Sequence, residues 1–236
     1  MGAYRDRFDA GQQLAAALGE FAHCPETLVL GLPRGGVPVA FEVSRLLGLP
    51  LDVLVVRKVG VPGQEELAMG AVADGDVLVC NEAVIRTLGL SMALVRSLAE
   101  HKAQELAARQ SLFRGGRPPL EVFGRTILLI DDGLATGSTM RAAVQSLRQR
   151  HPAQIIVAVP VGSAEACEEL AQLADRCICL QTPEPFHAVG YWYQDFGQVE
   201  DATVCALLRA QTVEAAPPAS DDRSESSPMS TAQKGA

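Results

Sequence analysis

The sequence lacks an excess of positive charge. It has 20 Lys and Arg residues against 28 Asp and Glu residues, which gives a formal net charge of −8 over 236 residues. A surface that coats nucleic acid needs clustered Lys and Arg to neutralise phosphates, so this composition argues against a nucleic-acid partner. A small anionic ligand is still allowed, because a few cations in one cleft can bind it. The candidates for that local charge are Arg34, Arg57 and Lys58.

Long apolar segments are also missing. No run approaches the length of a membrane span, and the opening residues, MGAYRDRFDAGQQL, lack the apolar centre of a signal peptide. We therefore expect no membrane partner and a cytoplasmic location. The 48% of hydrophobic residues can form the core of one α/β domain, which we place at residues 1–212. Residues 213–236 are rich in Ser, Pro, Ala and acids and are predicted to be a disordered tail.

Paired cysteine motifs are absent as well. The six cysteines contain no CxxC pair, and we expect them to be reduced and mostly packed. Cys177 and Cys179 could ligate a metal, but their spacing puts both on one face of a strand and no partner pair is evident.

The most informative run that is present is ILLIDDGLATGST, residues 127–139. Its four apolar residues are typical of a strand buried on both faces in a parallel sheet. Asp131 and Asp132 then reach the carboxyl edge of the sheet, where paired carboxylates can accept hydrogen bonds from vicinal ribose hydroxyls. Flexible glycines, hydroxyls and the free N–H groups of a helix start follow and suit a monophosphate: Gly133, Ala135, Thr136, Gly137, Ser138 and Thr139. The acidic pair alone could be a solvated turn, and residues 136–139 alone could be an ordinary helix cap. Together they favour a phosphorylated sugar as ligand.

At all thirteen positions this run resembles the phosphoribosyl pyrophosphate (PRPP) signature of type I phosphoribosyltransferases. The resemblance is greatest to a bacterial group of these proteins, extends over most of residues 4–210 and does not supply the acceptor. It implies an α/β fold whose doubly wound, mainly parallel sheet carries helices on both faces. It also implies a flexible loop and a small C-terminal hood at about residues 181–199.

A second glycine-rich loop, Gly31-Leu32-Pro33-Arg34-Gly35-Gly36, lies between a predicted strand at 28–30 and a predicted helix at 37–47. Its N–H groups and guanidinium suit a highly charged anion, although a plain tight turn would use the same glycines. In the resembling family this loop holds the pyrophosphate of PRPP. The resemblance therefore implies that Arg34, Gly35 and Gly36 bind pyrophosphate.

The remaining elements continue the alternation of strands and helices. We predict strands at 51–56, 126–130, 155–160 and 176–180, a hairpin around Asp74-Gly75-Asp76, and helices at 4–22, 81–88, 91–111, from the signature to about 150, and at 163–174. In the first helix the expected buried residues are Phe8, Leu14, Leu18 and Phe21. Residues 59–72, VGVPGQEELAMGAV, show no clear periodicity and are predicted to be a mobile loop.

Arg57 and Lys58 precede this stretch, which in the family closes over PRPP. Closure keeps water from an electron-poor ribose carbon while cations neutralise the departing pyrophosphate. We therefore name Lys58, Arg57 and Asp132 as catalytic candidates, although Arg57 could instead support the fold. Glu65 and Glu66 could handle protons or simply face solvent.

Aromatic residues are scarce, at 5% of the chain, yet five of them lie within residues 182–196. In the family the hood stacks on the acceptor base, and flat aromatic faces suit a planar heterocycle. Trp192 and Tyr193 are therefore predicted to bind the acceptor, while some of the five must close the core. His187, in the same segment, is better explained as a packed or surface residue.

These features together predict a pentosyltransferase that moves the 5-phosphoribosyl group of PRPP to a nitrogen of an N-heterocyclic acceptor and releases pyrophosphate. The ligand implies Mg²⁺, with Asp131 and Asp132 contacting it directly or through water. One alternative is a non-catalytic PRPP- or nucleotide-sensing regulatory module, and another is a phosphorylase or hydrolase acting on a nucleotide. The acceptor is not identified, and the oligomeric state stays open, a homodimer included.

Overall fold

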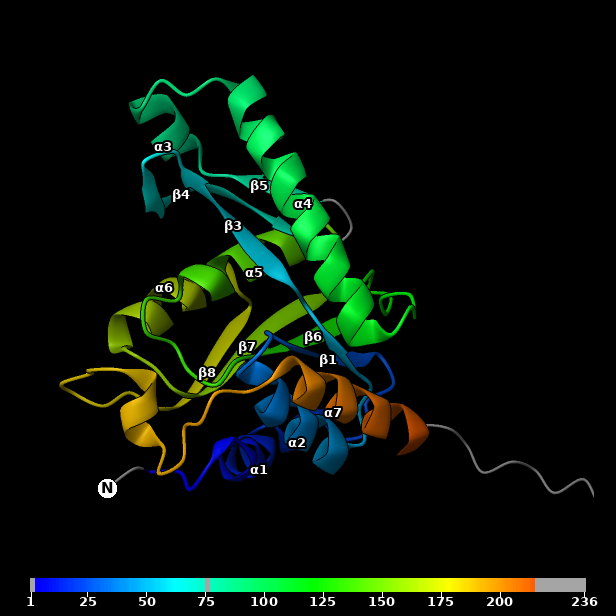
Figure 1. Ribbon diagram of the computed structural model, residues 1–236. Coiled ribbons are helices and arrows are strands. Elements are labelled where there is room, and N and C mark those ends of the chain that lie inside the picture. Colours follow the sequence, from blue (N-terminus) through cyan, green and yellow to red (C-terminus); the bar gives the residue numbers. More distant parts are fainter. Residues whose placement is uncertain (1–2, 75–76, 215–236) are drawn as a thin grey trace, which may run out of the picture.

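The core of the protein is a parallel sheet. The computed structural model describes residues 3–74 and 77–214 (Figure 1). Five strands pair in the order β2-β1-β6-β7-β8, and all four pairings are parallel. The strands are β1 (Thr27–Gly31), β2 (Leu51–Val53), β6 (Thr126–Ile130), β7 (Gln154–Val161) and β8 (Arg176–Gln181). The predicted doubly wound, mainly parallel sheet is confirmed.

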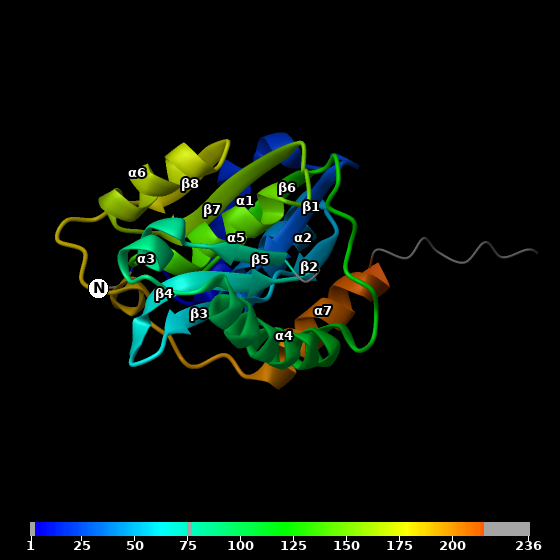
Figure 2. The same ribbon diagram turned by 90° about the horizontal axis from the view of Figure 1, so that it is seen from above.

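Helices cover both faces of this sheet (Figures 1 and 2). The helices α1 (Arg7–Ala17) and α2 (Gly36–Leu47) pack on one face, and α5 (Ser138–Arg148) and α6 (Ala164–Leu173) pack on the other. Along β6, Ile127 and Leu129 join the core beneath α5 and α6, whereas Leu128 and Ile130 join the core beneath α1 and α2. Four consecutive apolar residues are needed because this strand is buried on both sides.

The strand order creates a crevice at the carboxyl ends of β1 and β6. From β1 the chain continues outward to β2, whereas from β6 it continues in the opposite direction to β7 and β8. Open α/β sheets bind ligands where the strand order reverses in this way. The loops that follow β1 and β6 meet there, since the N–H of Leu32 donates to the carbonyl of Ile130 at 2.9 Å.

A second, antiparallel sheet lies apart from the first. It contains β3 (Val56–Val61), β4 (Gln64–Ala73) and β5 (Val77–Cys80), and it packs with α3 (Glu82–Thr87) and α4 (Met92–Arg114) (Figure 1). Residues 59–72, predicted to lack regular structure, instead belong largely to β3 and β4, and the predicted strand 51–56 is divided between the two sheets. The hairpin forms because Val59, Val61 and Met69 are buried in a core shared with α4.

A buried ion-pair network attaches this second sheet to the first. The Arg114 guanidinium on α4 donates to both carboxylate oxygens of Asp52 on β2, at 2.9 and 3.0 Å, and to the carbonyl of Val53 at 2.7 Å. It also pairs with Asp74 beside β4. All three charged side chains are buried, so removing one would leave its partners without a counter-charge.

The ends of the chain also differ from the predictions. The first helix begins at Arg7, because Tyr4 instead forms a bridge with Tyr193, and Phe8 is 37% exposed although Leu14 is buried as expected. An unpredicted helix, α7 (Asp201–Glu214), packs beside α2 and α4. The hairpin of β4 and β5 is confirmed, with residues 75–76 outside the described part. The rest of the predicted tail, residues 215–236, is outside it too.

The cysteines are free thiols throughout. Cys177 and Cys179 pack together with Cys167 against the core beneath α6, so their predicted position on one strand face is confirmed. Within residues 3–74 and 77–214, no group of three or more Cys, His, Asp or Glu side chains is arranged to hold a metal ion. The same residues include no helix with the length and apolar character needed to cross a membrane.

Candidate active site

The two glycine-rich loops approach each other closely at the crevice between β1 and β6. A Cβ atom on Gly36 would lie 2.7 Å from the carbonyl oxygen of Ile130 and 2.8 Å from the Cα of Asp131. A Cβ atom on Gly35 would overlap the carboxylate of Asp132. Both positions therefore require glycine for close approach of the backbone, and the loop after β1 lies directly against the acidic pair.

Asp131 and Asp132 are the two carboxylates at this crevice. The N–H of Asp132 donates to Oδ1 of Asp131 at 2.9 Å. Burial raises the pKa of Asp131 well above its usual range, and the neighbouring Asp132 carboxylate adds to the rise. Burial also raises the pKa of Asp132, against the opposing effect of Arg7, whose Nε donates to Asp132 Oδ2 at 2.8 Å. The acidic pair is thus a desolvated site with one cation beside it.

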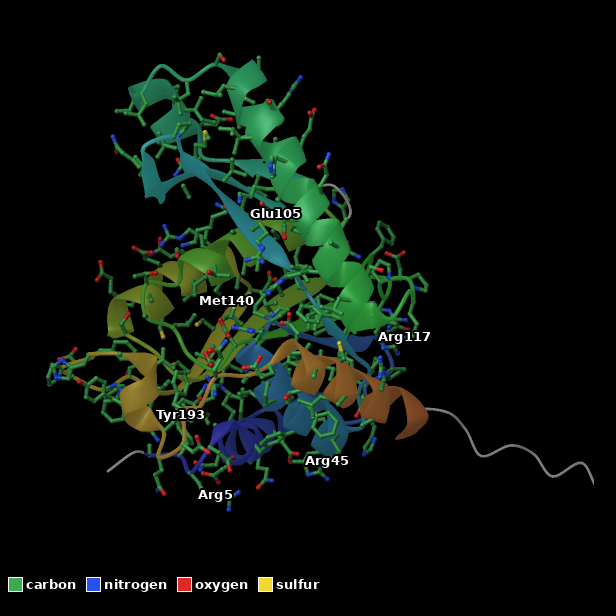
Figure 3. All side chains as sticks on the ribbon, in the orientation of Figure 1. Arg5, Arg45, Glu105, Arg117, Met140 and Tyr193 are labelled. Carbon is green, nitrogen blue, oxygen red and sulfur yellow. The ribbon has the colours of Figure 1, made fainter. Side chains whose placement is uncertain are left out.

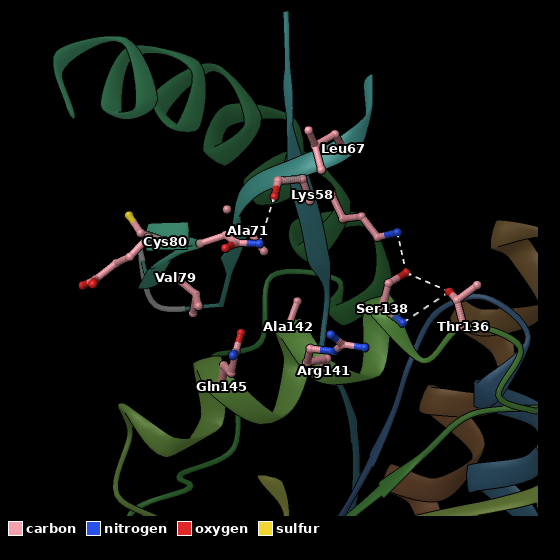
Figure 4. Close-up of a pocket in the computed structure, with 14 residues that line it drawn as sticks. Lys58, Leu67, Ala71, Val79, Cys80, Thr136, Ser138, Arg141, Ala142 and Gln145 are labelled. Atoms are coloured by element: carbon pink, nitrogen blue, oxygen red, sulfur yellow. Dashed lines mark hydrogen bonds between the residues drawn. The ribbon is translucent and has the colours of Figure 1, made fainter. Parts of the chain in front are cut away.

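The loop between β6 and α5 presents hydroxyl and N–H groups. Gly137 has a φ of 65°, which turns the chain into α5, and Ser138 is the first residue of that helix. The hydroxyl of Thr136 donates to Ser138 Oγ at 3.2 Å, and Nζ of Lys58 donates to the same oxygen at 2.6 Å (Figure 4). Thr136 and Thr139 are exposed. A helix start with hydroxyls and a lysine is suited to an anion.

A pocket of about 750 Å³ adjoins the loop between β6 and α5 and the first residue of that helix, residues 131–138, which together are called the anion loop below. One wall comes from β4 and β5, and the other comes from α5 (Figure 4). Lys58, Thr136, Ser138 and Arg141 lie at the end of the pocket that the loop forms, so hydroxyls and cations line it there. The volume and the polar end suit a phosphorylated small molecule.

Residues 7–195 match the family model described as "Phosphoribosyl transferase domain". The chain belongs to the phosphoribosyltransferase family.

Two relatives illustrate the extent of this similarity. The Mycobacterium tuberculosis (strain H37Rv) protein named "Putative phosphoribosyl transferase Rv0571c" is 45% identical over 205 residues, which is 87% of this chain and 46% of the relative. The solved structure of TT1426 from Thermus thermophilus has 43% identity and a TM-score of 0.80, with 89% of this chain and 99% of that chain covered. The chain thus spans about half the length of the curated relatives it matches.

In this phosphoribosyltransferase fold the two predicted catalytic cations are separated. Lys58 reaches the anion loop, as its bond to Ser138 requires. Arg57 precedes it on β3, so its side chain leaves the opposite face of the strand, where it acts electrostatically on Glu105 of α4. Its Nε atom is buried without a hydrogen-bond partner among the described residues. The side chains of Glu65 and Glu66 lie outside the described part of the chain.

Arg34 lies beside α7. Its Nη1 atom is 3.8 Å from Asp201 Oδ1, and Arg109 of α4 reaches the other oxygen of Asp201 at 3.6 Å. Asp201 was not predicted from the sequence. It connects the arginine of the loop after β1 to a helix that begins 167 residues later in the chain.

The aromatic segment is divided between core and surface. Tyr193 is only 5% exposed, its ring lies 5.4 Å from that of Tyr4 and 5.0 Å from that of Phe196, and its hydroxyl donates to the carbonyl of Asp132 at 2.6 Å. Trp192 is half-buried, with its Nε1 atom unpaired among the described residues, whereas Tyr191 is 71% exposed. Tyr193 thus contacts the acidic pair through its hydroxyl, while its ring is packed against Tyr4 and Phe196.

Sequence reasoning missed Arg7 and Tyr4 at this site. Both lie in the N-terminal segment, more than 120 residues before the acidic pair, and no local motif marks them. Their partners become evident only when α1 packs beside the end of the sheet. Tyr4 is fully buried, and its hydroxyl donates to the carbonyl of Pro160 at 2.7 Å.

Proposed function

We propose that the chain is an enzyme that transfers the 5-phosphoribosyl group of PRPP to a nitrogen of a heterocyclic acceptor and releases pyrophosphate. The observation that carries this proposal is the position of Asp131 and Asp132 between two anion-type loops at the crevice of the sheet. The family match supports the same reaction class. In PRPP the ribose hydroxyls lie between the 5′-phosphate and the pyrophosphate. The two carboxylates lie in the same order, between the two loops that would bind those phosphates.

Each part of the donor then has its own set of residues. Asp131 and Asp132 accept hydrogen bonds from the ribose hydroxyls. The N–H groups and hydroxyls of residues 135–139, with Lys58, hold the 5′-phosphate. The loop that contains Arg34, Gly35 and Gly36 holds the pyrophosphate, which its N–H groups and guanidinium can bind.

The transfer requires positioning more than covalent help from the protein. The bond between C1′ of ribose and the pyrophosphate oxygen breaks, and its electron pair leaves with pyrophosphate. The lone pair of the acceptor nitrogen forms the new bond to C1′, and the proton on that nitrogen passes to water. Because the ribose carbon is electron-poor during this exchange, the site must hold the acceptor ready and keep other nucleophiles away.

Mg²⁺ fits this proposal as a companion of the ligand. Asp131 and Asp132 provide hard carboxylate oxygens, but the described residues add no third ligand beside them. The ion would therefore be held largely by the oxygens of PRPP, with the two aspartates in direct or water-mediated contact. When bound, it neutralises negative charge on the pyrophosphate.

The acceptor side rests on the segment after β8. Trp192 and Tyr193 are our proposed acceptor-binding residues, and the exposed ring of Tyr191 adds a third flat surface nearby. Because Tyr193 is buried, in this proposal it acts on the acceptor site through its hydrogen bond to Asp132, and Trp192 and Tyr191 offer the more accessible ring faces. Planar N-heterocycles suit such rings, since aromatic faces stack on one another.

Calorimetric titration with PRPP and Mg²⁺ tests the donor half. We expect Asp132→Asn combined with Thr136→Val to weaken PRPP binding by more than about a hundredfold, since two charge-assisted contacts are lost. Thr87→Val is the matched control, because Thr87 is exposed at the end of α3. Equal PRPP affinity in the double variant and the wild-type chain would refute the assignment.

Release of pyrophosphate from PRPP, measured across purines, pyrimidines and other N-heterocycles, tests the acceptor half. Turnover with one member of the panel identifies the acceptor class. A chain that binds PRPP tightly but turns over none of them would instead be a PRPP- or nucleotide-sensing module, the alternative that the binding loops alone also allow.

A further inference from the structure

Arg7 connects the N-terminal helix to the acidic pair. Its Nε donates to Asp132 Oδ2 at 2.8 Å, and its Nη1 donates to the carbonyl of Gly197 at 2.8 Å. The guanidinium lies 3.9 Å from the ring centroid of Phe196, which is a stacking distance. The side chain is only 11% exposed. Its position is therefore set by three separate contacts.

Asp132 is held from several directions at once. Arg7 binds one carboxylate oxygen, the hydroxyl of Tyr193 binds the backbone carbonyl at 2.6 Å, and Gly35 lies against the side chain. The segment that carries Tyr193 is itself attached to the N-terminal segment, since the N–H of Gln194 donates to the carbonyl of Tyr4 at 2.9 Å. The orientation of Asp132 thus depends on the packing of the N-terminal segment against residues 190–197.

Arg7 also offsets a local excess of negative charge. Asp131 and Asp132 are adjacent and desolvated, and the proposed donor brings further negative charge to the same crevice. A nearly buried guanidinium on Asp132 lowers the repulsion between the two carboxylates. It occupies Oδ2, so Oδ1 is the oxygen that would accept from a ribose hydroxyl.

On the basis of the proposed function, we infer that Arg7 is a positioning residue for the donor ribose. It acts through Asp132: it fixes the carboxylate in the orientation that accepts the hydroxyl, and it does not contact pyrophosphate or the 5′-phosphate loop. Binding of PRPP depends on Arg7, whereas binding of inorganic pyrophosphate, which has no ribose, does not.

Three variants test this inference by calorimetry with PRPP and with inorganic pyrophosphate, both in the presence of Mg²⁺. We expect Arg7→Gln to weaken PRPP binding more than about tenfold, because truncating one member of a buried charge pair leaves the other uncompensated. Pyrophosphate affinity should stay within about twofold of wild type. Arg7→Lys keeps the charge and should recover part of the PRPP affinity. Arg5→Gln is the matched control, since the Arg5 side chain is 67% exposed and, among the described residues, forms its ion pair with Asp6. Figure 3 shows Arg5 at the surface of the protein.

The outcomes are distinct. Equal or tighter PRPP binding by Arg7→Gln overturns the inference, and tighter binding would mark Arg7 as a latch that competes with ribose. Parallel loss of PRPP and pyrophosphate affinity also overturns it, because a general structural role would move both. Absence of PRPP binding by the wild-type chain overturns the proposed function together with the inference. If Arg7→Gln does not fold, the comparison of Arg7→Lys with wild type carries the test, with about threefold weaker PRPP binding expected from the lost planar fork.

Discussion

The Nζ atom of Lys58 donates to the hydroxyl oxygen of Ser138 across 2.6 Å, although the two residues are 80 positions apart. This bond joins β3 of the second sheet to the first turn of α5. A lysine that already reaches the helix start can contact any phosphate bound there. One charged side chain thereby links the second sheet to the anion loop.

Replacement of Lys58 by Met should weaken binding of ribose 5-phosphate about tenfold, since a hydrogen bond from a charged donor is lost. Ribose 5-phosphate is the informative ligand because it contains the 5′-phosphate without pyrophosphate. Lys102→Met is the control, as Lys102 lies on α4 and pairs with Glu105 at the surface. Calorimetry that finds the two variants equal to wild type would show that Lys58 only holds the hairpin against α5.

The sequence predicted the main sheet well because each of its strands is a short apolar run that can be recognised without its neighbours. Residues 126–130 were placed correctly to the residue, since a short apolar run bounded by polar residues has few alternatives in a chain of alternating strands and helices. The hairpin of β3 and β4 was missed because its stability comes from packing on α4, which lies far along the sequence. A local signal was nevertheless present: Pro62-Gly63, with a φ of 78° at Gly63, occupies the central positions of a type II turn.

The candidate site was predicted only in part for a similar reason. The loops after β1 and β6 are local motifs, and strand order brings them together. The pairs Arg7 with Asp132 and Arg34 with Asp201 join segments that are distant in sequence, and any surface arginine would have looked the same. Tyr193 was ambiguous because an aromatic ring serves a core and a stacking surface equally well.

Substitution of Gly36 by Ala should destabilise the protein by about 1–3 kcal/mol, the usual cost of forcing an extra carbon into a packed site. The added Cβ would lie 2.7 Å from the Ile130 carbonyl oxygen and 2.8 Å from the Cα of Asp131, and these two backbone atoms cannot move aside easily. Gly19→Ala is the control, because no atom lies within 4 Å of a Cβ there. Urea unfolding measures both variants, and equal midpoints for them would contradict the close-packing account.

The stability of the β7 end of the sheet should depend on pH through Asp175. Its carboxylate accepts from the N–H of Ile155 at 2.7 Å and pairs with Arg148 at 2.9 Å. Burial raises the pKa of Asp175, but the Ile155 N–H and Arg148 outweigh this and lower it below its ordinary value. A depressed carboxyl pKa means that stabilisation is complete above the unfolded value, about 3.9, and is lost as pH falls through the folded value.

Asp175→Asn should therefore cost at most about 1 kcal/mol at pH 7, since solvent screens a side chain that is 38% exposed, and the difference from wild type should shrink as the pH approaches 3. Urea unfolding at several pH values measures this difference. Glu168→Gln, at an exposed position on α6, should show no such convergence. A difference for Asp175→Asn that stays constant with pH would mean that its charge does not contribute.

Tyr193→Phe should separate the packing of the ring from the function of its hydroxyl. The ring remains between Tyr4 and Phe196, so the loss of stability should be only about 1 kcal/mol, the contribution of one hydrogen bond. The carbonyl of Asp132 loses its donor, and the acidic pair gains freedom to move. We therefore expect PRPP affinity to fall several-fold while inorganic pyrophosphate binds as before. Tyr191→Phe is the matched control, since Tyr191 is 71% exposed. If both variants bind PRPP as tightly as wild type, the hydroxyl of Tyr193 does not position Asp132, and the Arg7 contact alone must orient it.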